Sequence, residues 1–242
     1  LKFLIKSQFF KQIIKSRLFF LNIVNNYPYP KSFSDNEKIQ FSKFLRNQTT
    51  AEWGGNRLYD GTNSHLQQIP DELTELVFFL KNYEKFNNLK LKKFLEIGFH
   101  AGYTNTILNK IFEFDEIVGI DNFQEFVDGN SLRANHRFKN LILVCGDSTL
   151  QKTISITKKF APFDLVLIDG NHDYDFVKND FENYTSMISK NSIILLHDIK
   201  SKNFPGVSKF WEEISISNQF KSKEFICDDY PMKAGIGLLQ KL

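Results

Sequence analysis

The chain has 242 residues, of which 42% are hydrophobic and 24% are charged. These are the proportions of an ordinary globular protein, so they exclude a disordered, collagen-like or coiled-coil chain. Lys and Arg exceed Asp and Glu by only three charges, and we therefore expect no nucleic-acid partner. Two cysteines, Cys145 and Cys227, are too few for a disulfide framework, which favours a cytoplasmic location.

In residues 1–24, Lys and Arg interrupt the apolar residues, so no stretch reaches the ~20 apolar residues of a membrane span. The segment also lacks the unbroken apolar block and cleavage site of a secretory signal. Phe3, Phe10 and Ile14 recur at roughly helical spacing, which predicts a basic amphipathic helix. Two alternatives remain open for it: packing on its own domain or a second subunit of a homo-oligomer, or peripheral contact with the inner face of a membrane.

A turn-rich stretch, residues 25–35, precedes a short predicted helix at 36–46. We therefore divide the chain into an N-terminal helical extension and linker, residues 1–46, and a main domain, residues 47–242.

The main domain begins with residues 47–69, which carry no hydrophobic period and predict a long ordered loop. Its residues Trp53, Tyr59 and Gln67 would form a substrate lid, or the two aromatic residues would be packing anchors. Pro70 then opens a strongly predicted amphipathic helix.

From residue 94 onward, short apolar runs alternate with helical stretches, which is typical of a parallel sheet covered on both faces. The runs are residues 94–98, 116–121, 141–147, 163–170 and 192–198. Near the C-terminus, EFICDD and GIGLLQKL predict two further strands that form a closing hairpin. The predicted fold class is therefore α/β, with helices on both faces of the sheet.

An acidic residue lies at or near the end of each apolar run: Glu96, Asp121, Asp147, Asp169 and Asp198. Ligands of open α/β sheets bind at the carboxyl ends of the strands, so we expect these carboxylates to line one rim. Taken singly, a strand-end acid could instead cap the following helix.

The first run leads into a glycine-containing loop, Glu96-Ile-Gly98-Phe-His-Ala-Gly102-Tyr-Thr104. The dinucleotide signature G-x-G-x-x-G is absent, and so is the lysine of a phosphate loop, which disfavours a pyrophosphate ligand. The loop resembles motif I of the class I S-adenosylmethionine-dependent methyltransferases. This resemblance implies a Rossmann-like class I methyltransferase with a seven-stranded, mostly parallel sheet, and Glu96, Gly98, Gly102 and Thr104 as cofactor-binding residues.

The next two strand ends agree with this resemblance. Asp121 follows Glu96 by 25 residues, a position from which a carboxylate can accept both hydroxyls of a ribose. In the methyltransferase interpretation, Asp121 holds the ribose of S-adenosylmethionine, and Asp147 and Ser148 contact its adenine.

A second set of motifs narrows the resemblance. The stretch IDG-x-H-x-Y, Asp180 in the next predicted helix, His197-Asp198, the helix PGV-x-x-FW and the strand GIGLL are similar to one group of small-molecule methyltransferases. This group is related to the cephalosporin-hydroxylase-like proteins and the macrolide-sugar O-methyltransferases. The likeness covers about residues 50–242.

In the macrolide-sugar relatives, acids at these positions bind a divalent cation and the histidine acts as a base. The resemblance therefore implies Asp169 and Asp198 as ligands of a cation such as Mg²⁺ or Mn²⁺, and His172 as the catalytic base beside Asp169. His197 departs from the relatives, which usually carry an acid there. We include His197 as a third candidate ligand, although imidazole suits Mn, Fe or Zn better than Mg²⁺.

The sequence thus predicts an O-methyltransferase that acts on a small-molecule or glycan acceptor, namely a sugar hydroxyl. Two alternatives remain: an oxidoreductase with an NAD-type cofactor on a Rossmann-like sheet, and a protein that kept the methyltransferase fold but lost catalysis.

Overall fold

The computed structural model describes residues 26–59, 65–123 and 139–241. The helix predicted within residues 1–24 lies outside this part. The helices are α2 (Asp35–Arg46), α3 (Pro70–Phe86), α4 (Tyr103–Phe112), α6 (Gln151–Thr157), α7 (Tyr174–Tyr184) and α8 (Pro205–Ser215), with short 3-10 helices η2 (Ala51–Trp53), η3 (Lys158–Phe160) and η4 (Thr185–Met187). In this described part, no helix has the length and apolar character needed to cross a membrane.

Seven strands form one sheet in the order β3-β2-β1-β4-β5-β7-β6. Their bounds are β1 (Lys93–Ile97), β2 (Glu116–Asp121), β3 (Leu141–Cys145), β4 (Phe163–Ile168), β5 (Ile188–His197), β6 (Phe220–Phe225) and β7 (Ile236–Lys241). The first five strands run parallel, while β7 runs antiparallel to both β5 and β6. The predicted seven-stranded, mostly parallel sheet with a C-terminal hairpin is confirmed.

The first strand of the hairpin differs from the prediction. The sequence run EFICDD was expected to be a strand, but β6 begins at Phe220 and ends at Phe225. The chain leaves the sheet there because the backbone N–H of Cys227 donates to the Glu72 side chain on α3 instead of to a strand.

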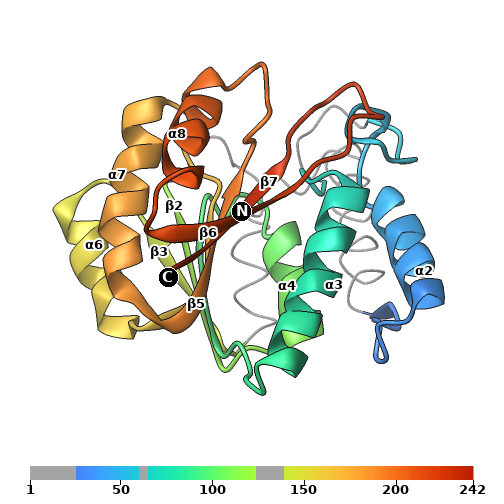
Figure 1. The fold of residues 1–242 in the computed structure, drawn as a ribbon, viewed down its shortest axis with the longest axis horizontal. Helices are drawn as coiled ribbons and strands as arrows, with labels where there is room; N and C mark the ends of the chain where they lie inside the picture. Colours follow the sequence, from blue (N-terminus) through green and yellow to red (C-terminus); the bar gives the residue numbers. More distant parts are fainter. Residues whose placement is uncertain (1–25, 60–64, 124–138, 242) are drawn as a thin grey trace, which may run out of the picture.

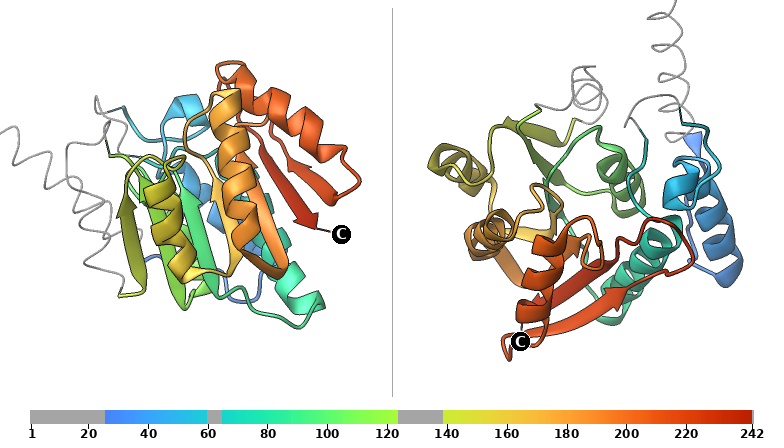
Figure 2. Two further views of the ribbon diagram at one scale, coloured as in Figure 1. Left: turned by 90° about the vertical axis from the view of Figure 1, so that its left-hand side faces the viewer. Right: turned by 90° about the horizontal axis from the view of Figure 1, so that it is seen from above.

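Alternate side chains of each central strand enter two separate cores, as expected for a sheet covered on both faces. Leu165 and Leu167 of β4 join the core formed with α2, α3 and α4. Val166 and Ile168 join the core formed with α7 and α8. Figure 1 shows α6, α7 and α8 on one side of the sheet and α3 and α4 on the other. The left view of Figure 2 shows the first group in front of the strands.

The predicted helix at 36–46 is present as α2 and packs onto the main domain. A reciprocal capping box between Ser34 and Glu37 defines its start. Phe41 and Leu45 are fully buried in the same core as α3. At the end of α2, the Arg46 guanidinium pairs with an α3 carboxylate. This part of the predicted extension is therefore anchored to the sheet-bearing domain.

Candidate functional site

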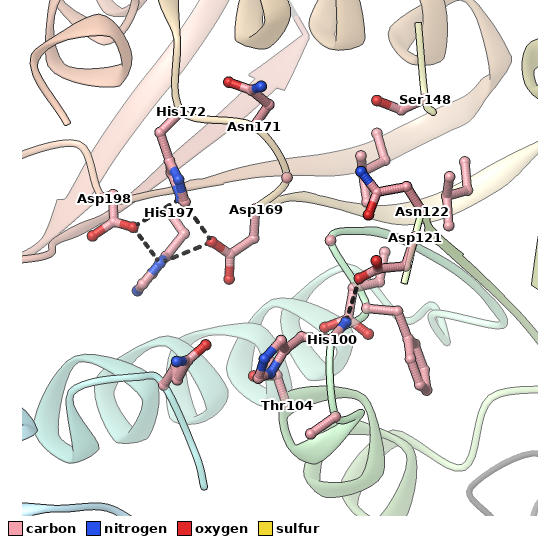
Figure 3. A pocket seen from close by; sticks show the side chains of 18 of the residues that line it. His100, Thr104, Asp121, Asn122, Ser148, Asp169, Asn171, His172, His197 and Asp198 are labelled. Atoms are coloured by element: carbon pink, nitrogen blue, oxygen red, sulfur yellow. Dashed lines mark hydrogen bonds and ion pairs between the residues drawn. The ribbon is translucent and has the colours of Figure 1, made fainter. Parts of the chain in front are cut away.

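One cavity of about 700 Å³ opens at the carboxyl ends of the parallel strands. Its volume is within the usual range for small-molecule sites. All the predicted site residues line it: Glu96, Gly98, Gly102, Thr104, Asp121, Asp147, Ser148, Asp169, His172, His197 and Asp198. The five strand-end carboxylates therefore share one rim. Figure 3 shows Asp169, His172, His197 and Asp198 on one side of the cavity and Asp121 and Ser148 on the other.

The glycine loop between β1 and α4 requires glycine at two positions. Gly98 has φ of +88°, and a Cβ there would lie 1.8 Å from the backbone oxygen of Asp169. Gly102 has φ of +73°, and its Cβ would lie 2.6 Å from the Phe99 ring. The loop thus turns sharply and packs directly against the turn after β4, which exposes its backbone to the cavity.

We expect Gly98→Ala to lower the free energy of unfolding by about 2–4 kcal/mol, because left-handed strain and a backbone clash add together. Chemical denaturation would measure the loss. Gly146→Ala is the matched control, since its Cβ would meet only the Thr153 side chain, at 2.7 Å from the hydroxyl oxygen. Equal stability losses in the two variants would contradict the proposed role of the Gly98 turn.

Asp121, the last residue of β2, forms hydrogen bonds with the backbone of the glycine loop and of the segment after β2. Its Oδ2 accepts the backbone N–H of His100 at 2.6 Å, and its Oδ1 accepts that of Phe123 at 2.7 Å. A carboxylate offers about four lone-pair positions, so these two bonds leave capacity for two more donors, such as the two hydroxyls of a diol.

Asp147 and Ser148 follow β3. Asp147 Oδ1 accepts hydrogen bonds from the Thr149 backbone N–H at 2.9 Å and from the Thr149 hydroxyl at 2.7 Å. The acid therefore stabilises a local turn while also lining the cavity. It does not cap the following helix, because the N-cap of α6 is Leu150 and no side chain caps it. The Tyr184 hydroxyl on α7 donates to the Ser148 carbonyl at 2.7 Å and fixes this turn from behind.

Glu96 lies within β1 and is only 2% exposed. Burial raises the pKa of its carboxyl well above the usual range, the nearby charges of Asp169 and Asp121 act in the same direction, and a hydrogen bond with Asn105 offsets part of the effect. These surroundings favour the neutral form of Glu96, which can donate one hydrogen bond.

On the other side of the cavity, two carboxylates and two imidazoles form a compact cluster. His172 Nε2 lies 3.7 Å from Asp169 Oδ1 and 3.2 Å from Asp198 Oδ2. His197 Nδ1 lies 3.1 Å from Asp169 Oδ1 and 3.2 Å from Asp198 Oδ2. Asp198 adopts the left-handed backbone conformation, with φ of 62°.

The charges in this cluster stabilise one another. Burial alone would lower the pKa of His172, but hydrogen bonding and the charges of Asp169 and Asp198 outweigh it and raise that pKa to about 9. The same two carboxylates raise the pKa of His197 well above its usual value. Burial would raise the pKa of Asp198, but the imidazoles overcome it and lower that pKa. The two carboxylates therefore favour the protonated form of both imidazoles.

The cluster also fits a divalent cation. Within the described residues, one ligand atom from each of Asp169, His172 and Asp198 lies within 4.8 Å of the others. Asp198 Oδ1 is buried without a hydrogen-bond partner, so its lone pairs are available to a cation. Two carboxylates with an imidazole suit Mn²⁺ better than Mg²⁺. This ligand set contains the predicted base, His172, whereas the prediction named His197 beside the two acids.

Two contacts at the cluster were not predicted. The side-chain amide of Gln68 donates to Asp169 Oδ2 at 3.0 Å. The Phe204 ring stacks on the His172 imidazole with centroids 3.9 Å apart and planes at 16°. Nothing in the spacing of Gln68 or Phe204 signals this role, because both come from loops that tertiary packing brings to the strand ends.

Of the three candidate lid residues, two line the cavity and one does not. Trp53 lines the cavity and lies parallel to the His197 ring at 6.2 Å, while also packing against Ile69 and Ala234. Gln67 lines the cavity as well. Tyr59 is 65% exposed and is outside the cavity lining, so it is neither a lid nor a packing anchor in this structure.

Residues 95–199 match a family model described as a methyltransferase domain. Among curated proteins, a 78-residue segment is 33% identical to the uncharacterized protein y4gI of Sinorhizobium fredii, strain NBRC 101917 / NGR234. The match covers 31% of this chain and 8% of that protein, so this chain spans only a small fraction of its relative.

Solved methyltransferase structures share the fold. The O-methyltransferase TomG from Streptomyces achromogenes, solved in complex with SAM, is 15% identical, with 86% of this chain and 91% of TomG covered and a TM-score of 0.54. CalS11, a TDP-rhamnose 3'-O-methyltransferase of calicheamicin biosynthesis, is 15% identical, with 94% of this chain and 93% of CalS11 covered and a TM-score of 0.54. These activities belong to those two proteins, and the likeness establishes the fold alone.

Proposed function

We propose that this chain, which has the Rossmann-like fold of solved methyltransferases and matches a methyltransferase-domain model over residues 95–199, transfers the methyl group of S-adenosylmethionine to a hydroxyl group of a sugar or glycan precursor. The observation that carries the proposal is the pairing, within one cavity, of a ribose-type carboxylate, Asp121, with the proton-accepting cluster around His172.

The cofactor would occupy the side of the cavity formed by the ends of β1, β2 and β3. Gly98 and Gly102 let the cofactor approach the backbone, Asp121 accepts the two ribose hydroxyls, and Asp147 and Ser148 face the adenine. The acidic rim also favours S-adenosylmethionine electrostatically, because its sulfonium and amino groups are both cationic.

The reaction is an in-line displacement at the methyl carbon. The acceptor oxygen forms a bond to that carbon, the carbon–sulfur bond breaks, and sulfur takes the electron pair as a neutral thioether. His172 Nε2 receives the hydroxyl proton, since a neutral hydroxyl is a weak nucleophile. For His172 to act as the base, a divalent cation would be held by Asp169 and Asp198 without the His172 imidazole. It would neutralise these carboxylates, and so lower the pKa of His172 and of an acceptor hydroxyl nearby.

The acceptor would lie beside the cluster. Trp53 and Phe204 offer aromatic faces there, and Gln67 and Gln68 offer amides, a combination suited to a ring that carries several hydroxyls. An oxidoreductase with an NAD-type cofactor is disfavoured by the missing third glycine and by the methyltransferase-domain match.

Calorimetric titration with S-adenosylmethionine and with NAD tests the cofactor. We expect micromolar binding of the first and none of the second. Incubation with methyl-¹³C S-adenosylmethionine and a panel of methyl glycosides would then be followed by ¹³C NMR for a new O-methyl signal. Binding of NAD alone would overturn the proposal, and binding of S-adenosylmethionine without transfer to any hydroxyl would favour the non-catalytic alternative.

Asp121→Ala should weaken S-adenosylmethionine binding by about 1.5–3 kcal/mol, or roughly 10- to 150-fold, because hydrogen bonds to a charged group are lost. Calorimetry on the folded variant measures this change. Asp115→Ala, just before β2 and outside the cavity lining, is the matched control and should bind as wild type does. Unchanged affinity in Asp121→Ala would remove Asp121 from the binding site.

A further inference from the structure

Asp180 is a buried acid with no role in the chemistry described above. It lies on α7, its exposed fraction is 0%, and it is outside the lining of the cavity. Neither carboxyl oxygen has a partner in hydrogen-bond geometry. A fully buried group of this kind is costly, so its retention calls for a specific explanation.

The position of Asp180 links three of the turns that build the cavity. A Cβ on Gly170 would lie 3.6 Å from Asp180 Oδ2 and 3.9 Å from the backbone nitrogen of Gly98. The Asp180 carboxyl and the start of the glycine loop therefore both lie close to Gly170. Asp180 also adjoins Ser148. The Ser148 carbonyl accepts a hydrogen bond from Tyr184, which lies on α7 as Asp180 does.

The surroundings of Asp180 favour its neutral form. A fully buried ionised carboxylate whose oxygens lack partners in hydrogen-bond geometry would be strongly destabilised in this position. The titratable groups that face it are Asp147 beyond β3 and Tyr184 on α7, and neither supplies a positive charge. Burial accordingly raises the pKa of Asp180 to about 7, with Ser148 offsetting and Asp147 adding to the effect.

We propose that Asp180 is a positioning residue that braces the Asp147–Ser148 turn against the turn at Gly170, and that it does so as a neutral carboxylic acid. It acts on cofactor binding through these turns and does not touch the reacting atoms. Ionisation of Asp180 would place an unpartnered charge behind both turns and loosen the cofactor side of the cavity. This inference rests on the proposed use of S-adenosylmethionine.

The test compares Asp180→Asn, which keeps the shape and stays neutral, with Asp180→Ala and wild type. Calorimetry would give the Kd for S-adenosylmethionine from pH 6 to 9. For wild type, we expect ionisation of Asp180 to raise the Kd by up to tenfold per pH unit above about pH 7. Asp180→Asn should lack this rise in Kd. Asp180→Ala should bind about tenfold more weakly at pH 6, while kcat at saturating cofactor changes little.

Tyr184→Phe is the matched control, because it removes the hydrogen bond to Ser148 but no titrating carboxyl. It should keep the pH profile of wild type. Parallel profiles for wild type and Asp180→Asn would overturn the inference, whether or not Asp180→Ala folds. A folded Asp180→Ala variant with wild-type affinity at pH 6 would also overturn it. Failure of wild type to bind S-adenosylmethionine at any pH would instead reject the proposed function itself.

Discussion

His172→Ala should lower kcat by roughly 10²–10⁴, equivalent to about 2.7–5.5 kcal/mol of transition-state stabilisation, while leaving cofactor affinity nearly intact. His172 lies in the cluster with Asp169 and Asp198, whereas the carboxylate proposed for the ribose, Asp121, is on the other side of the cavity. Loss of the imidazole therefore removes the proton acceptor without disturbing the groups proposed to hold the cofactor. Single-turnover rates and calorimetry would measure the two effects separately.

Asp175→Ala is a suitable control for this variant, because Asp175 is exposed on the first turn of α7 and is outside the cavity lining. It should retain wild-type rates. Full activity of His172→Ala with an identified acceptor would reject the base. An equal loss of cofactor affinity and of kcat would point to a role in folding the turn after β4.

Asp198→Ala should reduce activity to the level of wild type treated with a chelator, and a chelator should then do little further harm. Asp198 has a side chain only 3% exposed and lies against both imidazoles, so it is a central member of the candidate cation site. We expect Mn²⁺ affinity, measured by electron paramagnetic resonance, to fall by at least about 100-fold, since losing a direct ligand should exceed the usual effect of losing an outer partner.

Asp198→Asn is the companion variant, because asparagine tolerates the left-handed backbone of this position better than alanine does. Asp228→Ala removes a carboxylate that is 73% exposed and should leave Mn²⁺ binding unchanged. Wild-type activity that is insensitive to a chelator would reject the cation, and activity that depends on His172 should then rise with pH up to about 9. Unchanged Mn²⁺ affinity in both Asp198 variants would move the cation elsewhere.

Local patterns in the sequence determined most of the sheet and its rim. An apolar run as short as FDLVLI predicts a buried strand, because a strand covered on both faces buries successive side chains and a helix would need a longer run. The acid that follows such a run must then emerge at the carboxyl end of the sheet, as Asp169 and Asp198 do. For the same reason, helix signals at Ser34 and Pro70 predicted α2 and α3 closely.

Tertiary structure alone decided which groups meet and how they are charged. Gln68 hydrogen-bonds to Asp169, 101 residues away in the chain. Glu72 accepts a hydrogen bond from Cys227, 155 residues away, which lies beyond the end of β6. No local period encodes contacts of this kind, because they depend on how α3 and the loops pack around the finished sheet. The charge states of His172 and Asp180 likewise follow from burial and from neighbours that assemble only on folding, so their proton affinities are properties of the fold.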